Sequence, residues 1–324
     1  MNVWRLVGMV CLAFSAAAAA AETPTITNLS AKQRYPWNGL VDITCDIAYS
    51  DTNELLDVSI VATNTATGAA LSVRTIHVAD GEEMFVTAGH RAFIWDAGTD
   101  VPDVKIDDVA LTADVKRFDG VQLWENGPYW ERCNVGADKP EDYGYYFWWG
   151  DTVGYWRNGS RWDAVDGSQT GFSFSSGNCP TYGKSASKLR SAGYIDSTGN
   201  LVAAHDAATA HLGAPWRMPT DAEWDALIDN CDTTWTTRNG VKGRLVTGRG
   251  AYASKSIFLP AAGYGYGSGL NDLGSHGYYW SSTPCSDLSN RAWFLHFGSG
   301  YFYRYDNNFR CYGQSVRPLR GFAE

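Results

Sequence analysis

The chain has 324 residues, 14 of them tryptophan, and a formal net charge of −9 at pH 7. This length exceeds that of one small domain and predicts two. The acidic balance, without any basic cluster, argues against nucleic acid as a partner.

The first 21 residues have the features of a secretory signal peptide. Arg5 supplies a positive start, residues 6–14 form an apolar run, and residues 16–21 are small, so we expect cleavage near Ala21. The apolar run is too short to cross a bilayer, and no longer run follows, so no membrane insertion is expected. Cys11 lacks the small residue that a lipoprotein signal places before its cysteine. The sequence therefore predicts a soluble protein that is secreted or held at the cell surface.

Charge and aromatic content change near residue 115. Residues 22–115 carry 15 Asp and Glu against 5 Lys and Arg, whereas residues 116–324 carry 20 of each class. Eleven of the 14 tryptophans lie after residue 115. We therefore predict an N-terminal domain over residues 22–115, a linker over 116–120 and a C-terminal domain over 121–322.

The N-terminal domain is predicted to consist of β-strands. Apolar and polar residues alternate over residues 41–49, 56–62, 93–95 and 109–115, which is the pattern of half-buried strands. The alternation places Cys45 on the core face. Strands at this spacing, with no helical period between them, predict an immunoglobulin-like β-sandwich.

The C-terminal domain opens with an aromatic run over residues 121–149, which must form a core or line a groove because so many rings cannot all face water. Residues 151–200 are rich in Gly, Ser and Asn and predict a long loop region. Short helices are expected over 185–192 and 205–212.

Residues 214–224 contain the signals of a helix N-terminus. Pro215 and Pro219 cannot lie inside a helix, and Thr220 stands three residues before Glu223, which is the spacing of a capping box. The apolar face of the expected helix consists of Trp224, Leu227 and Ile228. We expect the helix to end at residues 230–231.

Strands are expected again after this helix. The pattern predicts a turn over residues 235–240 and strands over 243–247, 256–263, 291–297 and 301–305. Ser299 and Gly300 are expected to turn the last two strands into an antiparallel pair.

Five short motifs of the C-terminal half occur in a characteristic order, at residues 124–149, 216–224, 257–263, 279–282 and 310–318. Together they resemble the Fibrobacter succinogenes major paralogous domain over roughly residues 120–320. That family is similar to the C-type-lectin-like fold, so the resemblance implies an α+β domain of this kind. The N-terminal domain resembles the small β-sandwich domains that precede such domains in exported bacterial proteins.

Two further families share that fold. Residues 216–224 also resemble the formylglycine-generating-enzyme, or sulfatase-modifying-factor, domain. Variable proteins of diversity-generating retroelements present their binding residues on the same scaffold, near its C-terminal end. Because the fold hosts unrelated activities, function has to be argued from the site.

Calcium has two candidate positions in the sequence. The Asp-rich segment with Asp100, Asp103, Asp107 and Asp108 lacks EF-hand spacing, and a solvated acidic loop is the simpler interpretation. The tripeptides with which C-type lectins hold calcium are absent, and Asn271–Asp272 is the nearest approach. We therefore expect no metal and no cofactor.

The sequence contains candidate residues for two kinds of catalysis. Formylglycine-type oxidation needs two neighbouring copper-binding cysteines, whereas Cys285 and Cys311 stand 26 residues apart. A disulfide between them, across the ends of the 291–305 hairpin, is the simpler interpretation, although six cysteines after residue 21 allow 15 pairings. Four histidines could act as acids or bases, but none has a matching signature: His205, His211, His276 and His296.

Binding remains as the expected function. Tyr301, Tyr303 and Tyr305 share one strand face by the period of two, and tyrosines offer rigid amphipathic surface to a sugar or a protein. The expected binding residues are Phe294, His296, Tyr301, Tyr303, Tyr305, Asp306, Asn307, Asn308 and Arg310, with a second surface at Tyr264, Tyr266, Asn271 and Asp272. The alternative is that the tyrosine face packs against residues 150–200 as core.

The sequence thus predicts a secreted bacterial binding protein, not an enzyme. Its C-terminal domain would bind a glycan or a surface protein, and the N-terminal sandwich would be a spacer. The alternative is an exported oxidoreductase related to the formylglycine-generating family.

Overall fold

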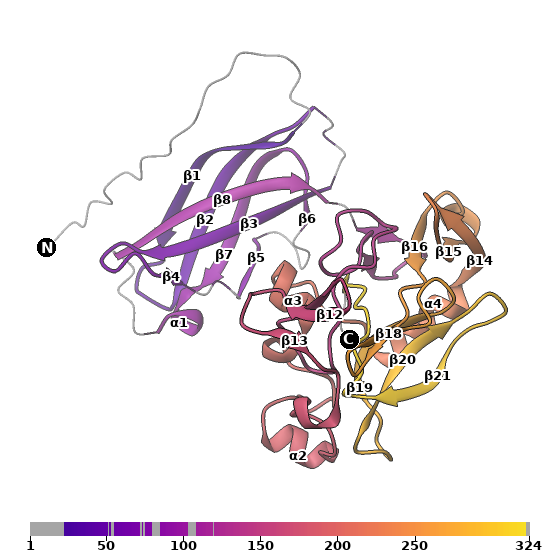
Figure 1. Ribbon diagram of the computed structural model, residues 1–324. Helices are drawn as coiled ribbons and strands as arrows, with labels where there is room; N and C mark the ends of the chain where they lie inside the picture. Colours follow the sequence, from indigo (N-terminus) through magenta and orange to yellow (C-terminus); the bar gives the residue numbers. More distant parts are fainter. Residues whose placement is uncertain are drawn as a thin grey trace, which may run out of the picture. The chain divides into compact units, whose positions relative to one another are not determined.

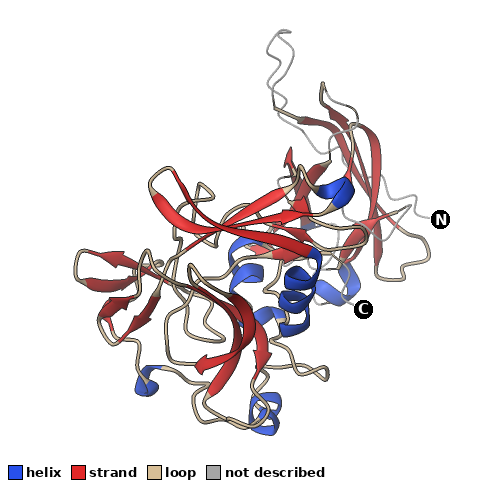
Figure 2. Ribbon diagram, turned by 90° about the vertical axis from the view of Figure 1, so that its right-hand side faces the viewer, coloured by secondary structure: helices blue, strands red, loops and turns tan. Residues whose placement is uncertain are grey.

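The computed structural model describes residues 23–50, 52, 55–71, 73, 75–79, 85–102, 108–118 and 120–321, with the backbone alone at 77, 85 and 304–306. The predicted signal peptide lies outside these residues, as do Asp103 and Asp107. The chain groups into two compact units, Met1–Phe118 and Asp119–Glu324. Strands greatly outnumber helices (Figures 1 and 2), which confirms the prediction of a β-rich protein.

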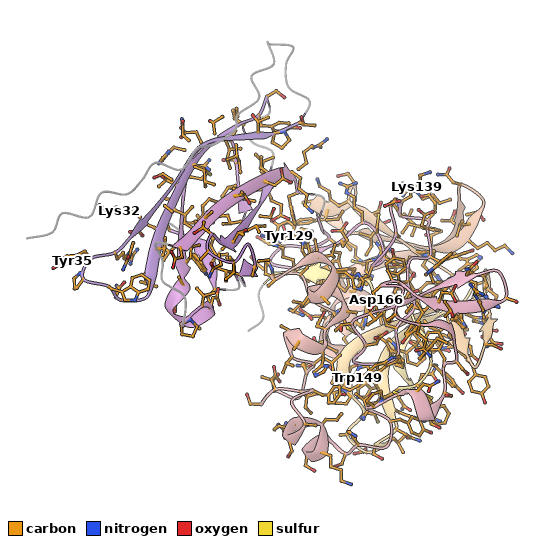
Figure 3. The ribbon with its side chains drawn as sticks, turned by 60° about the vertical axis from the view of Figure 1, so that its left-hand side comes forward. Lys32, Tyr35, Tyr129, Lys139, Trp149 and Asp166 are labelled. Carbon is orange, nitrogen blue, oxygen red and sulfur yellow. The ribbon has the colours of Figure 1, made fainter. Side chains whose placement is uncertain are left out.

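The N-terminal unit contains two antiparallel sheets. One has the strand order β1-β2-β7-β5 and the other β4-β3-β6, with β8 paired to β3. The elements are β1 Thr25–Gln33, β2 Leu40–Ala48, β3 Leu56–Asn64, β4 Ala70–Leu71, β5 Ile76–Val78, β6 Phe85–Val86, β7 Gly89–Asp96, α1 Ala97–Asp100 and β8 Val109–Arg117. The four predicted strands are confirmed, whereas β1 was missed because a register shift between Thr27 and Ser30 breaks the alternation of its apolar residues. The loop between β1 and β2 carries Tyr35, which is 99% exposed (Figure 3).

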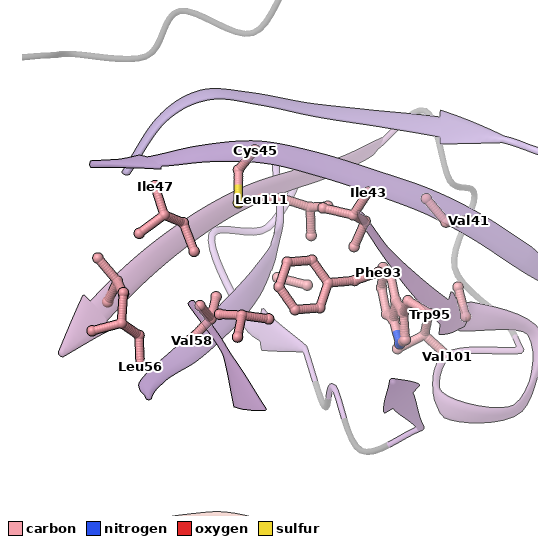
Figure 4. Close-up of a cluster of buried hydrophobic side chains, with 14 residues drawn as sticks. Val41, Ile43, Cys45, Ile47, Leu56, Val58, Phe93, Trp95, Val101 and Leu111 are labelled. Carbon is pink, nitrogen blue, oxygen red and sulfur yellow. The ribbon is translucent and has the colours of Figure 1, made fainter. Parts of the chain in front are cut away.

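Both sheets of this unit contribute to one buried cluster (Figure 4). Ile43 and Cys45 come from β2, Phe93 and Trp95 from β7, and Leu111 from β8. Cys45 is fully buried, as the alternation predicts. Burial of such aliphatic and aromatic side chains, at about 25 cal/mol for each Å² removed from water, supplies the main stabilisation of the unit.

The C-terminal unit is built from short sheets. Their strand orders are β22-β10-β9, β11-β12-β13, β14-β15-β16, β17-β18 and β19-β20-β21. The strands are β9 Val121–Gln122, β10 Tyr129–Trp130, β11 Tyr155–Asn158, β12 Arg161–Ala164, β13 Thr170–Phe172, β14 Cys231–Arg238, β15 Val241–Gly248, β16 Ser256–Pro260, β17 Tyr264–Tyr266, β18 Gly269–Asn271, β19 Gly277–Pro284, β20 Arg291–Phe297, β21 Phe302–Phe309 and β22 Leu319–Arg320. The helices are η2 Ser176–Asn178, α2 Ala186–Ser191, η3 Ala203–His205, α3 Ala207–Leu212, α4 Asp221–Asn230 and η4 Gly250–Tyr252.

Helix α4 begins and ends where the sequence predicts. The Thr220 hydroxyl accepts from the Glu223 amide at 3.2 Å, and the Glu223 carboxylate accepts from the Thr220 amide at 2.8 Å, so the capping box is confirmed. Trp224 and Leu227 are fully buried on the apolar face. The helix packs against β19, β20 and β21, which hold its tryptophan in place.

Three sequence predictions for this unit are wrong. The polar segment over 151–200 contains the sheet β11-β12-β13, because Trp162 and Phe172 give it a core of its own. The turn expected over 235–240 is confined to Asn239 and Gly240, whose φ angles of 47° and 85° suit a tight hairpin, and β14 runs to Arg238. Cys285 and Cys311 are free thiols, and no disulfide joins the cysteines of the described residues.

Candidate functional site

Two glycines decide which way the neighbouring tyrosines point. Gly265 and Gly313 face each other across an antiparallel bridge, with N–H···O distances of 2.7 and 2.9 Å. A Cβ on either glycine would lie within 2.5 Å of the Phe174 ring, so both glycines face the core. Because extended residues alternate between faces, Tyr264, Tyr266 and Tyr312 point to the other side.

These three tyrosines form a cluster that we call the first platform. The rings of Tyr264 and Tyr312 are stacked with their centroids 5.2 Å apart, and that of Tyr266 lies 5.1 Å from Tyr312. Tyr266 is 56% exposed, whereas the other two are half-buried. The platform therefore offers aromatic surface to solvent on a backbone that is fixed by the glycine bridge.

A second platform lies on the hairpin of β20 and β21. Tyr301 and Tyr303 are stacked at 4.7 Å, and the Tyr301 hydroxyl lies 3.1 Å from Nε2 of His296. His276 joins them, with its ring 6.0 Å from that of Tyr301. Tyr303 is 42% exposed, and Tyr301, His296 and His276 are half-buried. The antiparallel hairpin predicted from residues 291–305 is confirmed.

Tyr278 of β19 joins the two platforms. Its ring centroid lies 4.8 Å from Tyr264 and 4.6 Å from His296, and its hydroxyl donates to Oδ2 of Asp272 at 2.7 Å. Burial, followed by this hydrogen bond, raises the pKa of Tyr278, so the hydroxyl remains a donor. The two surfaces that the sequence offers as alternatives are thus continuous. We call the whole set the aromatic band: Tyr264, Tyr266, Asp272, His276, Tyr278, His296, Tyr301, Tyr303 and Tyr312.

The loop that carries Asp272 is tightly held. The Asp272 carbonyl accepts from the amides of Ser275 and His276 at 3.0 and 3.1 Å and from the Ser275 hydroxyl at 2.8 Å. Asp272 itself has φ of 57°, a conformation that aspartate tolerates better than most residues. The carboxylate of this exposed residue is consequently held at the hydroxyl of Tyr278, the ring that joins the platforms.

Two of the predicted binding residues belong to the core. Phe294 is 2% exposed and stacks on Tyr278 from within, at 5.7 Å. Arg310 is fully buried, donates to the carbonyls of Arg291, Thr181 and Lys184, and lies over the Trp149 ring. Neither side chain can line an exposed surface. The alternation of side chains along the strand predicts that Phe294 and His296 share one face. The structure buries that face at Phe294 and leaves it partly exposed at His296.

The remaining predicted residues lie around the band. Asn307 accepts twice from Arg291, through its carbonyl and its side chain, and the Asn308 side chain accepts from the Phe309 amide. Both are therefore used in local structure. Asn271 pairs with Tyr264 at the edge of the first platform. For Tyr305 and Asp306 only the backbone is described; Tyr305 pairs with Phe294 in the hairpin.

Sequence reasoning missed three members of the band, His276, Tyr278 and Tyr312. The pattern around Gly313 contains a signal for Tyr312, because a glycine that is flanked by large residues in a strand marks a close contact on its own face. Tyr278 and His276 gave no such signal, since their role depends on which strands pair. Only the fold brings β17, β19 and β20 together.

Other chemistry has little support in the described residues. They contain no group of three or more His, Cys, Asp and Glu side chains arranged to hold a metal ion. A shallow hollow of about 390 Å³ lies elsewhere, lined by Trp124, Glu125, Asn230, Arg249, Ala251 and Tyr252. The Arg249 guanidinium in it is already engaged by Asp232 and two backbone carbonyls, so the hollow offers few unused polar groups.

Comparison with known proteins gives one partial match. A family model described as "Domain of unknown function (DUF8237)" matches residues 235–319. No curated protein and no solved structure matches. The matched range is less than half of the chain, and it contains every residue of the aromatic band. No helix in the described part of the chain has the length and apolarity needed to span a membrane.

Proposed function

We propose that residues 121–322 form a C-type-lectin-like domain of the Fibrobacter succinogenes major paralogous type, which binds a glycan through the aromatic band. The N-terminal unit would be an immunoglobulin-like sandwich that acts as a spacer in a secreted or surface protein. The observation that carries this proposal is the unbroken series of ring contacts from Tyr266 to Tyr303, partly exposed on both platforms, with the Asp272 carboxylate bound to the buried ring that joins them.

Such a surface suits carbohydrate chemistry. A sugar ring has apolar C–H faces, which stack on aromatic rings, and polar hydroxyls at its edge. Tyrosine rings present apolar area at low cost in side-chain entropy, and their hydroxyls accept or donate hydrogen bonds. Asp272 and His276 add polar groups beside the rings. Orientation of a ligand by a few polar groups on an apolar floor is the usual organisation of a small-molecule site.

The alternative, an oxidoreductase related to the formylglycine-generating family, has less support. That chemistry uses a thiolate held by copper. Cys311 is buried, and its burial raises the pKa of the thiol to about 11, which disfavours the thiolate at neutral pH. No observation in the C-terminal unit favours this activity over binding.

The test is retention on a glycan array, run with and without EDTA. We expect the protein to be retained equally in both conditions. Replacing the two most exposed rings, Tyr266→Ser with Tyr303→Ser, should abolish retention while the free energy of unfolding changes by no more than about 1 kcal/mol, since exposed substitutions usually cost about 0.5 kcal/mol each.

The matched control is Tyr35→Ser, which removes an exposed tyrosine of the N-terminal unit and should leave retention unchanged. Retention of the doubly substituted protein on the array would show that the glycan binds outside the aromatic band. A blank array would favour a protein ligand, and retention that EDTA removes would instead indicate a calcium-dependent lectin.

A further inference from the structure

The aromatic band is divided rather than uniform. Tyr266 and Tyr303 are 56% and 42% exposed, but Tyr278 between the platforms is only 8% exposed. The band thus presents two partly exposed aromatic surfaces that are separated by a buried ring. The Asp272 carboxylate lies at the hydroxyl end of that ring, since it accepts the Tyr278 hydroxyl at 2.7 Å.

The two most exposed rings of the band are connected only through a series of other rings. Tyr266 reaches Tyr303 through Tyr312, Tyr264, Tyr278, His296 and Tyr301, with ring centroids 4.6–5.2 Å apart at each contact. A single pyranose is about as large as one aromatic ring, so it can stack on one platform but not on both. A ligand that uses the whole band must be a chain.

The negative charge of Asp272 restricts the class of sugar chain that the band can bind. Asp272 is exposed and accepts hydrogen bonds, which matches sugar hydroxyls and opposes carboxylate or sulfate groups. Two basic residues lie near the first platform. Arg291 donates to Asn307 and lies 4.3 Å over the Phe309 ring, and Arg157 donates to the Ser268 carbonyl and lies 5.0 Å over the Trp162 ring. Both are therefore engaged within the protein instead of being presented to an anionic ligand.

We propose that the band binds an extended chain of neutral sugars, one sugar stacked on each platform and the intervening sugar hydrogen-bonded to Asp272. This inference rests on the proposed glycan-binding function and adds to it the class and the length of the ligand. Two linked stacking contacts reinforce each other, because the second contact forms at a high effective concentration once the first is made.

The experiment is calorimetric titration of the full chain with neutral oligosaccharides of one to six units. The probes are the cello-, xylo-, manno- and β-1,3-gluco- series, with oligogalacturonate as the acidic comparison. In at least one neutral series the affinity should rise with length and then level off at the length that spans both platforms. The rise should amount to at least about tenfold.

Variants locate the two contacts. Tyr266→Ser and Tyr303→Ser, each alone, should remove the gain with length and leave weak binding of the short oligomers. Asp272→Asn retains the size of the side chain and should weaken long oligomers by about tenfold, equivalent to about 1.4 kcal/mol. Tyr35→Ser is again the control.

The outcomes separate this inference from the function on which it rests. Binding of a single sugar with no gain from length, lost in only one of the two tyrosine variants, would overturn the extended chain and keep glycan binding. Preference for oligogalacturonate would overturn the neutral class. No binding of any probe, together with a blank glycan array, would overturn both proposals.

Discussion

The two units of the chain are stabilised by different kinds of core. In the N-terminal unit the buried side chains are aliphatic or aromatic, and none among its described residues is charged. In the C-terminal unit four arginines are buried with a set of tryptophans: Arg244, Arg310, Arg317 and Arg320 with Trp130, Trp149, Trp162, Trp224 and Trp280.

The difference follows from how much of each unit lies outside strands. Most of the described N-terminal unit is strand, so its ladders satisfy the backbone groups and the alternating side chains fill the core. In the C-terminal unit long segments such as residues 131–154 lie between strands, and their carbonyls need donors. Arg317 supplies them, since it donates to the carbonyls of Glu131, Arg132 and Phe258 and to the side chain of Asn134.

Each unit should fold by itself if its core is self-sufficient, and separating the units is the change with the largest expected effect on stability if it is not. We expect fragments 22–116 and 118–324 to melt cooperatively when studied separately, because each contains its own buried clusters. Thermal unfolding followed by circular dichroism checks this. Two fragments that fold only when mixed would show that the cores are interdependent.

Arg317→Met should be the most damaging single change considered. Arg317 is 0% exposed, and its loss leaves three carbonyls and one amide oxygen without a donor. Each unsatisfied buried group costs about 1–3 kcal/mol, so we expect a loss above about 3 kcal/mol. Urea denaturation gives the value.

The matched change in the N-terminal unit is Arg34→Met, which breaks a surface pair with Asp42. We expect a much smaller loss, because exposed ion pairs contribute little to stability. Equal losses in the two variants would contradict the contrast between the cores.

Gly313→Ala should have an intermediate effect. Its Cβ would lie 2.4 Å from the ring of Phe174, which is packed against Tyr155, Trp162 and Phe172 and cannot retreat. Overpacking of this kind costs about 1–3 kcal/mol. Gly300→Ala, whose Cβ meets no atom within 4 Å, is the control and should be close to neutral. A stable Gly313→Ala protein would mean that the bridge of Gly265 and Gly313 can open.

The last prediction concerns how the stability of each unit depends on pH. Burial raises the pKa of Asp151 to about 7, although the amides of Val153 and Gly154 donate to its carboxyl group. The folded state thus keeps a proton that the unfolded chain loses near pH 4, and this contribution to stability, complete below about pH 4, is lost as the pH rises to 7. Its slope is at most about 1.4 kcal/mol per pH unit.

Asp151→Asn should remove that pH dependence, as measured by urea denaturation at several pH values between 4 and 8. In the N-terminal unit, Asp42 gives the opposite dependence of stability on pH. A hydrogen bond from Arg34 lowers the pKa of Asp42, so its contribution is present above about pH 4 and is lost on acidification. Parallel stability curves for Asp151→Asn and the unaltered protein would contradict the assignment.

Sequence patterns predict the parts of this structure that depend on neighbours along the chain. Alternation located β2, β7 and β20, and the spacing of Thr220 and Glu223 located the start of α4. Sequence patterns give wrong predictions where contacts between residues far apart in the sequence determine which side chains are buried. Phe294 and His296 share a strand face, yet one is covered and the other is half-exposed.

The candidate site could be predicted only in pieces for the same reason. Tyr264, Tyr301 and Tyr303 were predicted as binding residues, but nothing local indicates that Tyr278 joins them into one cluster. That requires the register of β19 with β20 and the bridge between Gly265 and Gly313. Both are interactions between residues far apart in the sequence.

The alternation around Gly265 and Gly313 has a consequence for how this protein can change over generations. The inward positions are fixed by the space that Phe174 leaves, and Tyr264 and Tyr312 stack on each other across the bridge, whereas Tyr266 is 56% exposed. Replacements at Tyr266 can therefore accumulate with little penalty in folding. A lineage that meets a new ligand can acquire recognition of it by altering this tyrosine, and the scaffold beneath it is inherited unchanged.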